Sequence, residues 1–181
     1  MSFPIVGIGA SAGGLEAVSE LLASLPAESG LALLLVQHLD PAHESLLAEI
    51  LAKKTAMPVS KATEGMAVEP NRLYVIPHNA SMTIADGLLR LQSRNPTQGK
   101  HMPIDVLFHS LAEDQGPNAI GVVLSGGGSD GALGIHKRSR VRVASPSPRT
   151  RPRRASAICR GPPSGLAAWI LSWRLPRSAE S

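Results

Sequence analysis

Three side chains in this sequence could together carry out nucleophilic catalysis: Ser11, His38 and Asp130. Each comes shortly after an apolar run, and these runs occupy residues 4–9, 31–37 and 119–125. A serine hydroxyl becomes an effective nucleophile when a histidine removes its proton and a carboxylate orients that histidine. The residue types are therefore those of a hydrolase that works through an acyl-enzyme.

Each of these side chains also has an ordinary structural explanation. Ser11 lies in Gly-Ala-Ser-Ala-Gly, which fits the G-x-S-x-G pattern of a strand-to-helix turn, but a serine there could simply cap the helix. His38 could satisfy loop hydrogen bonds, and Asp130 could stabilise a turn in its glycine-rich loop. The joint occurrence of the three after buried runs favours the catalytic interpretation.

The elements that must position these side chains alternate between strand and helix. Helical spacing of apolar residues predicts helices over 11–25, 45–54 and 104–113. The segment 59–91 differs, because four short stretches separated by turn signals, including those at 69–71 and 86–87, predict short strands, some of them in a hairpin. We expect an α/β fold with three layers: a doubly wound, mainly parallel, Rossmann-like sheet with a small hairpin insertion. Sites in such sheets form at the carboxyl ends of strands.

Composition places the chain among globular cytoplasmic proteins. It has 181 residues, 43% of them hydrophobic, which is enough for one domain with a real core. No apolar run reaches the roughly 18–20 residues that cross a bilayer, and no signal peptide is evident. The single cysteine, Cys159, excludes an internal disulfide. We therefore expect a cytoplasmic protein with no membrane insertion.

Six stretches of the chain resemble, in sequence order, the signature segments of one enzyme family, and they lie at residues 6–14, 36–39, 74–77, 84–87, 102–108 and 124–131. The family is the catalytic domain of CheB-type protein-glutamate methylesterases. The resemblance covers residues 3 to 135 and is greatest to the versions fused to a CheR-type methyltransferase. Several motifs in order are far more specific than G-x-S-x-G alone.

The resemblance implies both an activity and the residues that perform it. Ser11 would attack the γ-carbonyl of a methylated glutamate on a chemoreceptor-like protein, His38 would act as general base and Asp130 would orient it. The backbone amides of Gly127 and Ala12 would form the oxyanion hole. The same chemistry could deamidate glutamines. The family further implies functional pairing with a CheR-type methyltransferase, and we expect no cofactor and no metal.

Several positions depart from the family pattern. Gly127 replaces a common methionine, and His78 stands where a second proline is usual, with no role assigned to it from the sequence. Because the first motif begins almost at Met1, we expect no N-terminal receiver domain to regulate the site in cis.

The segment 136–181 does not resemble the family and is expected to form a separate tail after a truncated catalytic domain at 1–135. Residues 1–135 hold 7 Lys/Arg and 13 Asp/Glu, a net charge of −6, whereas 136–181 hold 11 and 1, a net charge of +10. The tail is either a disordered basic extension or the product of a reading-frame shift near Ile135. With suitable codons, a two-base shift turns residues 136–140 into Gln-Ala-Ile-Lys and 158–160 into Met-Pro, both expected in the family.

Three alternative functions stay open at this point. A frame shift would remove the closing part of the sheet and leave an inactive truncated homologue. The glycines at 7, 9 and 13 suggest a nucleotide-binding module, but the spacing is one residue too long and the second strand lacks an acidic ribose ligand. The basic tail would permit loose nucleic-acid binding, but no binding fold accompanies it, so we expect no nucleic-acid partner.

Overall fold

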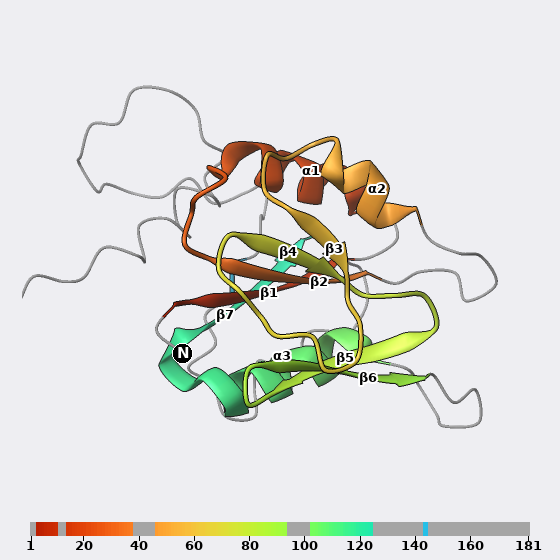
Figure 1. Ribbon diagram of the computed structural model, residues 1–181, viewed down its shortest axis with the longest axis vertical. Helices are drawn as coiled ribbons and strands as arrows, with labels where there is room; N and C mark the ends of the chain where they lie inside the picture. Colours follow the sequence, from red (N-terminus) through yellow and green to blue (C-terminus); the bar gives the residue numbers. More distant parts are fainter. Residues whose placement is uncertain (1–2, 11–13, 38–45, 94–101, 125–142, 145–181) are drawn as a thin grey trace, which may run out of the picture.

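The computed structural model describes residues 3–10, 14–37, 46–93, 102–124 and 143–144 (Figure 1). Its centre is a sheet with the strand order β3-β4-β2-β1-β7-β8, in which all neighbours are parallel. The strands are β1 (Ile5–Ala10), β2 (Ala32–Gln37), β3 (Val59–Lys61), β4 (Arg72–Val75), β7 (Ala119–Leu124) and β8 (Val143–Ala144). Every residue of β1 and β2 is buried, which explains their unbroken aliphatic sequences.

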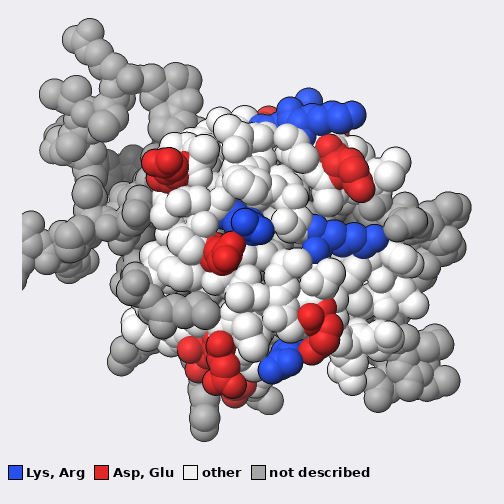
Figure 2. Space-filling model, viewed as in Figure 1, with Lys and Arg blue, Asp and Glu red and all other residues white. Residues whose placement is uncertain are grey.

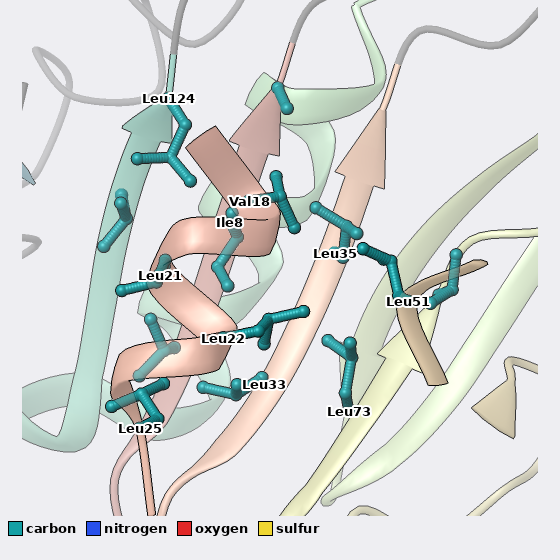
Figure 3. Packing of buried hydrophobic residues seen from close by; sticks show 14 of the residues in the cluster. Ile8, Val18, Leu21, Leu22, Leu25, Leu33, Leu35, Leu51, Leu73 and Leu124 are labelled. Carbon is teal, nitrogen blue, oxygen red and sulfur yellow. The ribbon is translucent and has the colours of Figure 1, made fainter. Parts of the chain in front are cut away.

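Helices α1 (Leu15–Ser24) and α2 (Leu47–Ala52) cover one face of this sheet. On α1, Val18, Leu21 and Leu22 are buried at helical spacing against the sheet (Figure 3). The helix ends at Ser24, just before Pro26, which cannot continue it. This face contains the first of two hydrophobic clusters.

Helix α3 (Pro103–Gln115) and the antiparallel hairpin of β5 (Ala80–Ala85) and β6 (Leu88–Ser93) cover the opposite face (Figure 1). Pro103 opens α3 at a position where no amide hydrogen is needed, and a short 3₁₀ turn (Gly116–Asn118) leads on to β7. Phe108, Leu111 and Tyr74 are fully buried in the second hydrophobic cluster, between this layer and the sheet. The three layers are therefore helices, sheet, and helix with hairpin.

The hairpin turns at Asp86 and Gly87, both of which have positive φ, at 53° and 72°. Two consecutive residues of this kind make the two-residue turn that matches the natural twist of paired strands. The hairpin and its turn are as the sequence predicts.

Side chains of helix α3 accept hydrogen bonds from one amide of β5 and from both amides of the turn. Ser110 Oγ accepts a hydrogen bond from the Ile84 amide at 3.2 Å. The Asp114 carboxylate accepts one from Asp86 at 2.6 Å and one from Gly87 at 3.3 Å. Side chains of α3 therefore attach the hairpin to the helix.

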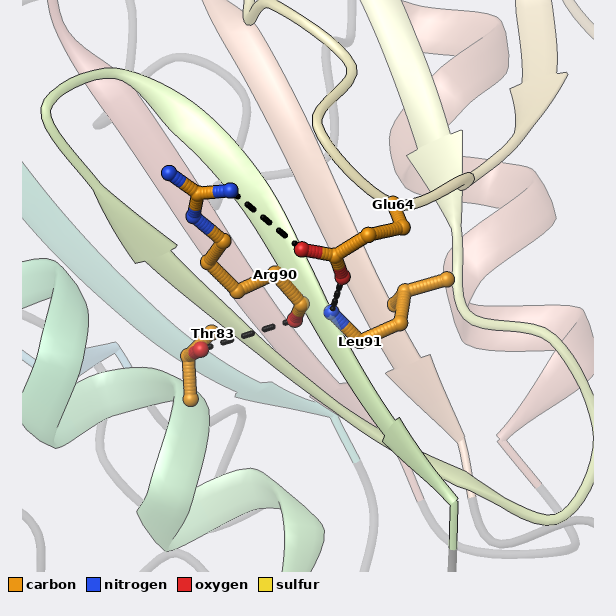
Figure 4. A network of polar contacts seen from close by, with 4 residues as sticks. All are labelled: Glu64, Thr83, Arg90 and Leu91. Carbon is orange, nitrogen blue, oxygen red and sulfur yellow. Dashed lines mark hydrogen bonds and ion pairs between the residues drawn. The ribbon is translucent and has the colours of Figure 1, made fainter.

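The segment before β4 satisfies the outer side of β6. The Leu89 amide donates to Met66 O and the Gly65 amide donates to Leu89 O, both at 2.8 Å. Next to them, Glu64 accepts a hydrogen bond from the Leu91 amide at 2.5 Å and forms an ion pair with Arg90 at 3.3 Å (Figure 4). The Glu64 side chain thus accepts the next outward amide of β6, beyond the point where backbone groups serve as partners.

The expected α/β fold with a mainly parallel sheet and a hairpin is confirmed. Strand β8 lies within the segment that the sequence assigns to the tail, parallel to β7 through Gly121 with Val143 and Val122 with Ala144. The rest of 136–181 lies outside the described residues. The expectation that the C-terminal part of the fold is incomplete therefore stays a prediction. The boundary at residue 135 stays a prediction.

Candidate active site

The three central strands end at the same level. Ala10, the last residue of β1, is in register with Gln37, the last residue of β2, and with Leu124, the last residue of β7. Figure 3 shows the three arrowheads side by side, pointing the same way. The carboxyl ends of neighbouring parallel strands therefore form one short, continuous edge.

The predicted catalytic residues follow these strand ends in the chain. Ser11 comes directly after β1, His38 directly after β2, and Asp130 six positions after β7. All three lie outside the described residues, as do Ala12 and Gly127, the predicted oxyanion donors. The described strand ends that precede them lie on one edge, directly before Ser11 and His38 and six positions before Asp130, and the roles of these residues stay predictions.

Two glycines on β1 bring α3 close to this edge. A β-carbon on Gly9 would overlap Ile104 Cγ2 and lie 3.1 Å from its Cδ1, and one on Gly7 would lie 3.0 Å from Leu111 and Phe108. The alternate residues of β1 face α1 and are larger. Helix α3 therefore runs opposite to β1, and its first turn lies against the carboxyl end of the strand that leads to Ser11.

A fourth strand, β4, reaches the same edge. Val75, its last residue, is in register with Leu35 of β2, and the Ile76 amide extends the ladder by donating to Leu35 O at 3.0 Å. Pro77 then ends the ladder because it has no amide hydrogen. His78 follows, so it lies at the edge beside the end of β2.

His78 has a buried ring nitrogen. Its Nδ1 is shielded from solvent and makes no hydrogen bond with the residues that the structure describes, although the side chain as a whole is only half-buried. Asn79 follows with a φ of 53°, which turns the chain towards the hairpin. From the sequence alone, no role was assigned to His78. Its position three residues after a buried strand was the signal that could have marked it.

Tyr74 anchors β4 to the segment before it. Its hydroxyl donates to Ala67 O at 3.0 Å and accepts a hydrogen bond from the Glu69 amide at 2.9 Å. Burial raises the pKa of this hydroxyl above its usual value, so it stays a neutral donor at physiological pH. The strand that leads to His78 is therefore held by both polar bonds and packing.

The described residues contain no group of three or more His, Cys, Asp or Glu side chains arranged to hold a metal ion. Their charged side chains comprise ten acidic and five basic residues. On the face shown in Figure 2, the two signs are interspersed. None of the described helices is long and apolar enough to cross a membrane.

Comparison with known proteins identifies relatives of the whole described domain. The family model described as CheB methylesterase matches residues 6–142. The chain is 39% identical over 135 residues to a protein-glutamate methylesterase/protein-glutamine glutaminase of Xanthomonas euvesicatoria pv. vesicatoria. It has the same identity, over the same length, to a protein of that name from Escherichia coli O157:H7.

These alignments cover 72% of this chain but only 37% and 38% of the two relatives, so the chain spans well under half their length. The crystal structure of the Thermotoga maritima CheB methylesterase catalytic domain superposes with a TM-score of 0.64 at 27% identity, covering 74% of this chain and 73% of that one. The predicted similarity to the methyltransferase-fused versions stays a prediction. With the family model matching residues 6–142 and the same fold found in the solved catalytic domain, the chain belongs to the CheB methylesterase family.

Proposed function

We propose that this domain hydrolyses glutamate γ-methyl esters on chemoreceptor-like proteins, with Ser11 as nucleophile, His38 as general base and Asp130 as the carboxylate that orients it. The observation that carries the proposal is the common level at which β1, β2 and β7 end. A triad requires three side chains from different parts of the chain within hydrogen-bond reach. Strand ends in register are a rigid way to supply them.

In this mechanism, the Ser11 oxygen bonds to the γ-carbonyl carbon while His38 takes the hydroxyl proton. The amides of Gly127 and Ala12 stabilise the negative oxygen of the tetrahedral intermediate. When the ester C–O bond breaks, His38 gives its proton to the departing methoxide, and methanol leaves. Water, deprotonated by His38, then attacks the acyl-enzyme and releases the glutamate carboxylate and free Ser11.

The same acyl-enzyme can form from glutamine, with ammonia leaving in place of methanol. The names of the relatives, which combine a methylesterase with a glutaminase, favour this second reaction. An esterase of this kind needs a methyltransferase that forms the glutamate ester in the first place. We therefore propose a CheR-type enzyme as functional partner in chemotaxis or a related pathway. We place the reaction in the cytoplasm, where a single cysteine stays reduced.

The test is methanol release from a methylated receptor fragment. Ser11→Ala and His38→Ala should each lower the rate by at least about 10³-fold, because the residues of a triad act as a unit. Ser19→Ala and His109→Ala are matched controls, since Ser19 bonds to Leu15 O within α1 and His109 lies on the exposed side of α3. Release that is unaffected by Ser11→Ala would contradict the proposal.

The alternative of an inactive truncated homologue makes a different prediction for the same assay. A chain that melts cooperatively yet releases no methanol and no ammonia would establish it. Family membership would then describe ancestry, and the proposed activity would be wrong for this chain.

A further inference from the structure

His78 lies on the same sheet edge as the carboxyl ends of β1 and β2, but too far from β1 for a part in the reaction itself. In the order β4-β2-β1, two strand spacings separate the strand that leads to His78 from the strand that leads to Ser11. Neighbouring strands lie about 4.8 Å apart, so the separation is roughly 10 Å. A group that reacts with the ester must come within about 3 Å of it. A polypeptide chain that carries the ester would, however, span this distance within a few residues.

The buried nitrogen determines which hydrogen bond the ring can make. A proton on Nδ1 would be a buried donor without an acceptor among the described residues, and leaving such a donor unsatisfied costs about 1–3 kcal/mol. Nδ1 also lacks a donor among these residues when the proton is on Nε2, so Nε2 is the ring nitrogen left to bond a ligand, and it is a hydrogen-bond donor in the tautomer that carries the proton there. His78 as a whole is only half-buried, so the residue is accessible from this edge of the sheet.

The backbone around His78 is held in place on both sides of the residue. The Ile76 amide bonds to β2, Pro77 restricts its own φ, and Asn79 turns the chain at a φ of 53°. Tyr74, further back on β4, is fully buried. A backbone held in this way needs little further ordering when a ligand binds beside it.

We propose that His78 is a specificity-determining residue, whose Nε2–H donates a hydrogen bond to an oxygen atom of the polypeptide segment beside the ester. The proposal rests on the proposed function, since it requires a polypeptide substrate at this edge. It predicts that His78 matters for an ester within a protein segment and not for a small ester that ends at the reacting group.

Two variants separate the donor from the shape of the ring. His78→Phe keeps a flat ring of similar size and removes both nitrogens. His78→Gln places an amide N–H near the position of Nε2. A merely structural histidine would lose stability in His78→Phe. Here the folded state should be no less stable, because the replacement removes a buried nitrogen that has no partner among the described residues.

The full chain is assayed with a methylated receptor fragment and with p-nitrophenyl acetate. In His78→Phe, KM for the fragment should rise about three- to tenfold, the worth of one hydrogen bond, with kcat unchanged. Hydrolysis of the small ester should not change, and His78→Gln should restore KM to within about twofold. An unchanged KM in His78→Phe, or an equal loss on both substrates, would overturn the assignment while leaving the esterase in place.

Binding measured by calorimetry separates this result from a failure of the proposed function. In a Ser11→Ala background, the methylated fragment should bind about three- to tenfold more weakly when His78→Phe is added. Equal affinity of the Ser11→Ala chain with and without His78→Phe would overturn the role of His78, whether or not the unmodified chain hydrolyses the ester. A fragment that does not bind the Ser11→Ala chain at all would overturn both proposals.

Discussion

Gly9 on β1 and Ile104 on α3 lie so close together that residue 9 has room for a hydrogen atom but not for a methyl group. This contact lies one residue before the end of β1 and one residue into α3. It determines how near the first turn of the helix can come to the edge that carries the proposed site. The sequence motif around Ser11 therefore has a packing function in addition to any catalytic one.

Gly9→Ala should destabilise the fold by about 1–3 kcal/mol, the usual cost of overpacking a well-packed core. Because the helix must move at the active-site edge, esterase activity should fall as well. The measurement is urea unfolding, with methanol release assayed on the same preparation. Ile104→Ala removes the side chain that a methyl group at residue 9 would meet. The double variant of Gly9→Ala and Ile104→Ala should therefore be at least about 1 kcal/mol more stable than the sum of the two single effects predicts. Simple additivity would show that the two residues do not compete for space.

Asp114→Ala should loosen the hairpin. This carboxylate accepts hydrogen bonds from the amides of Asp86 and Gly87, and its removal should cost about 1–2 kcal/mol in urea unfolding. Hydrogen exchange at these two amides should quicken. Glu113→Ala is the matched control, since the exposed Glu113 pairs with His109 on the same helix and should contribute within about 0.5 kcal/mol. Equal effects of the two variants would show that Asp114 does not anchor the turn.

Glu64 should make part of the stability depend on pH on the acid side. The hydrogen bond from the Leu91 amide, with a smaller contribution from Arg90, holds the pKa of Glu64 below its ordinary value of 4.5. A folded-state pKa lower than the unfolded one gives stability that is fully present above pH 4.5 and is lost as pH falls through the folded-state value. Glu64→Gln should therefore flatten the acid limb of a stability–pH curve. Glu49→Gln, at an exposed position on α2, should leave it unchanged; the same flattening in both would refute the assignment.

We propose that the tail after residue 135 derives from a reading-frame shift. Sequencing the gene should show that reading two bases later from codon 136 gives Gln-Ala-Ile-Lys and, further on, Met-Pro. A chain built in that frame should melt at least about 4 °C higher, equivalent to roughly 1–2 kcal/mol for a domain of this size, and should be the more active esterase. An uninterrupted frame in related strains, or a restored chain with unchanged melting and activity, would contradict the proposal.

Buried strands were predictable because a parallel sheet covered on both faces needs uniformly apolar residues. The run at 31–37 and the observed β2, Ala32–Gln37, differ by one residue, and the Asp86-Gly87 turn was evident from its residue types. The helix predicted over 104–113 became Pro103–Gln115, because Pro103 can occupy the first turn. Local chemistry determined each of these elements.

Long-range partners could not be predicted in the same way. Nothing near Val59 or Leu73 indicates that β3 and β4 join the parallel sheet while β5 and β6 form a separate one, since all four read as short strands. Glu64 looks like an ordinary surface acid until Leu91, which is 27 residues away, is brought beside it. The position of His78 beside the end of β2 likewise became evident only once β4 was placed next to β2. Such pairings depend on topology and not on local residue preference.

The hydrogen bonds along the outer side of β6 limit how other proteins can bind the β5–β6 hairpin. Strand addition, in which a foreign peptide lengthens a sheet through main-chain hydrogen bonds, requires free amide and carbonyl groups along an edge. On the outer side of β6, Met66 and Glu64 accept hydrogen bonds from the amides of Leu89 and Leu91. A partner could therefore not add a strand along this part of β6, and the same bonds protect it from edge-to-edge self-association.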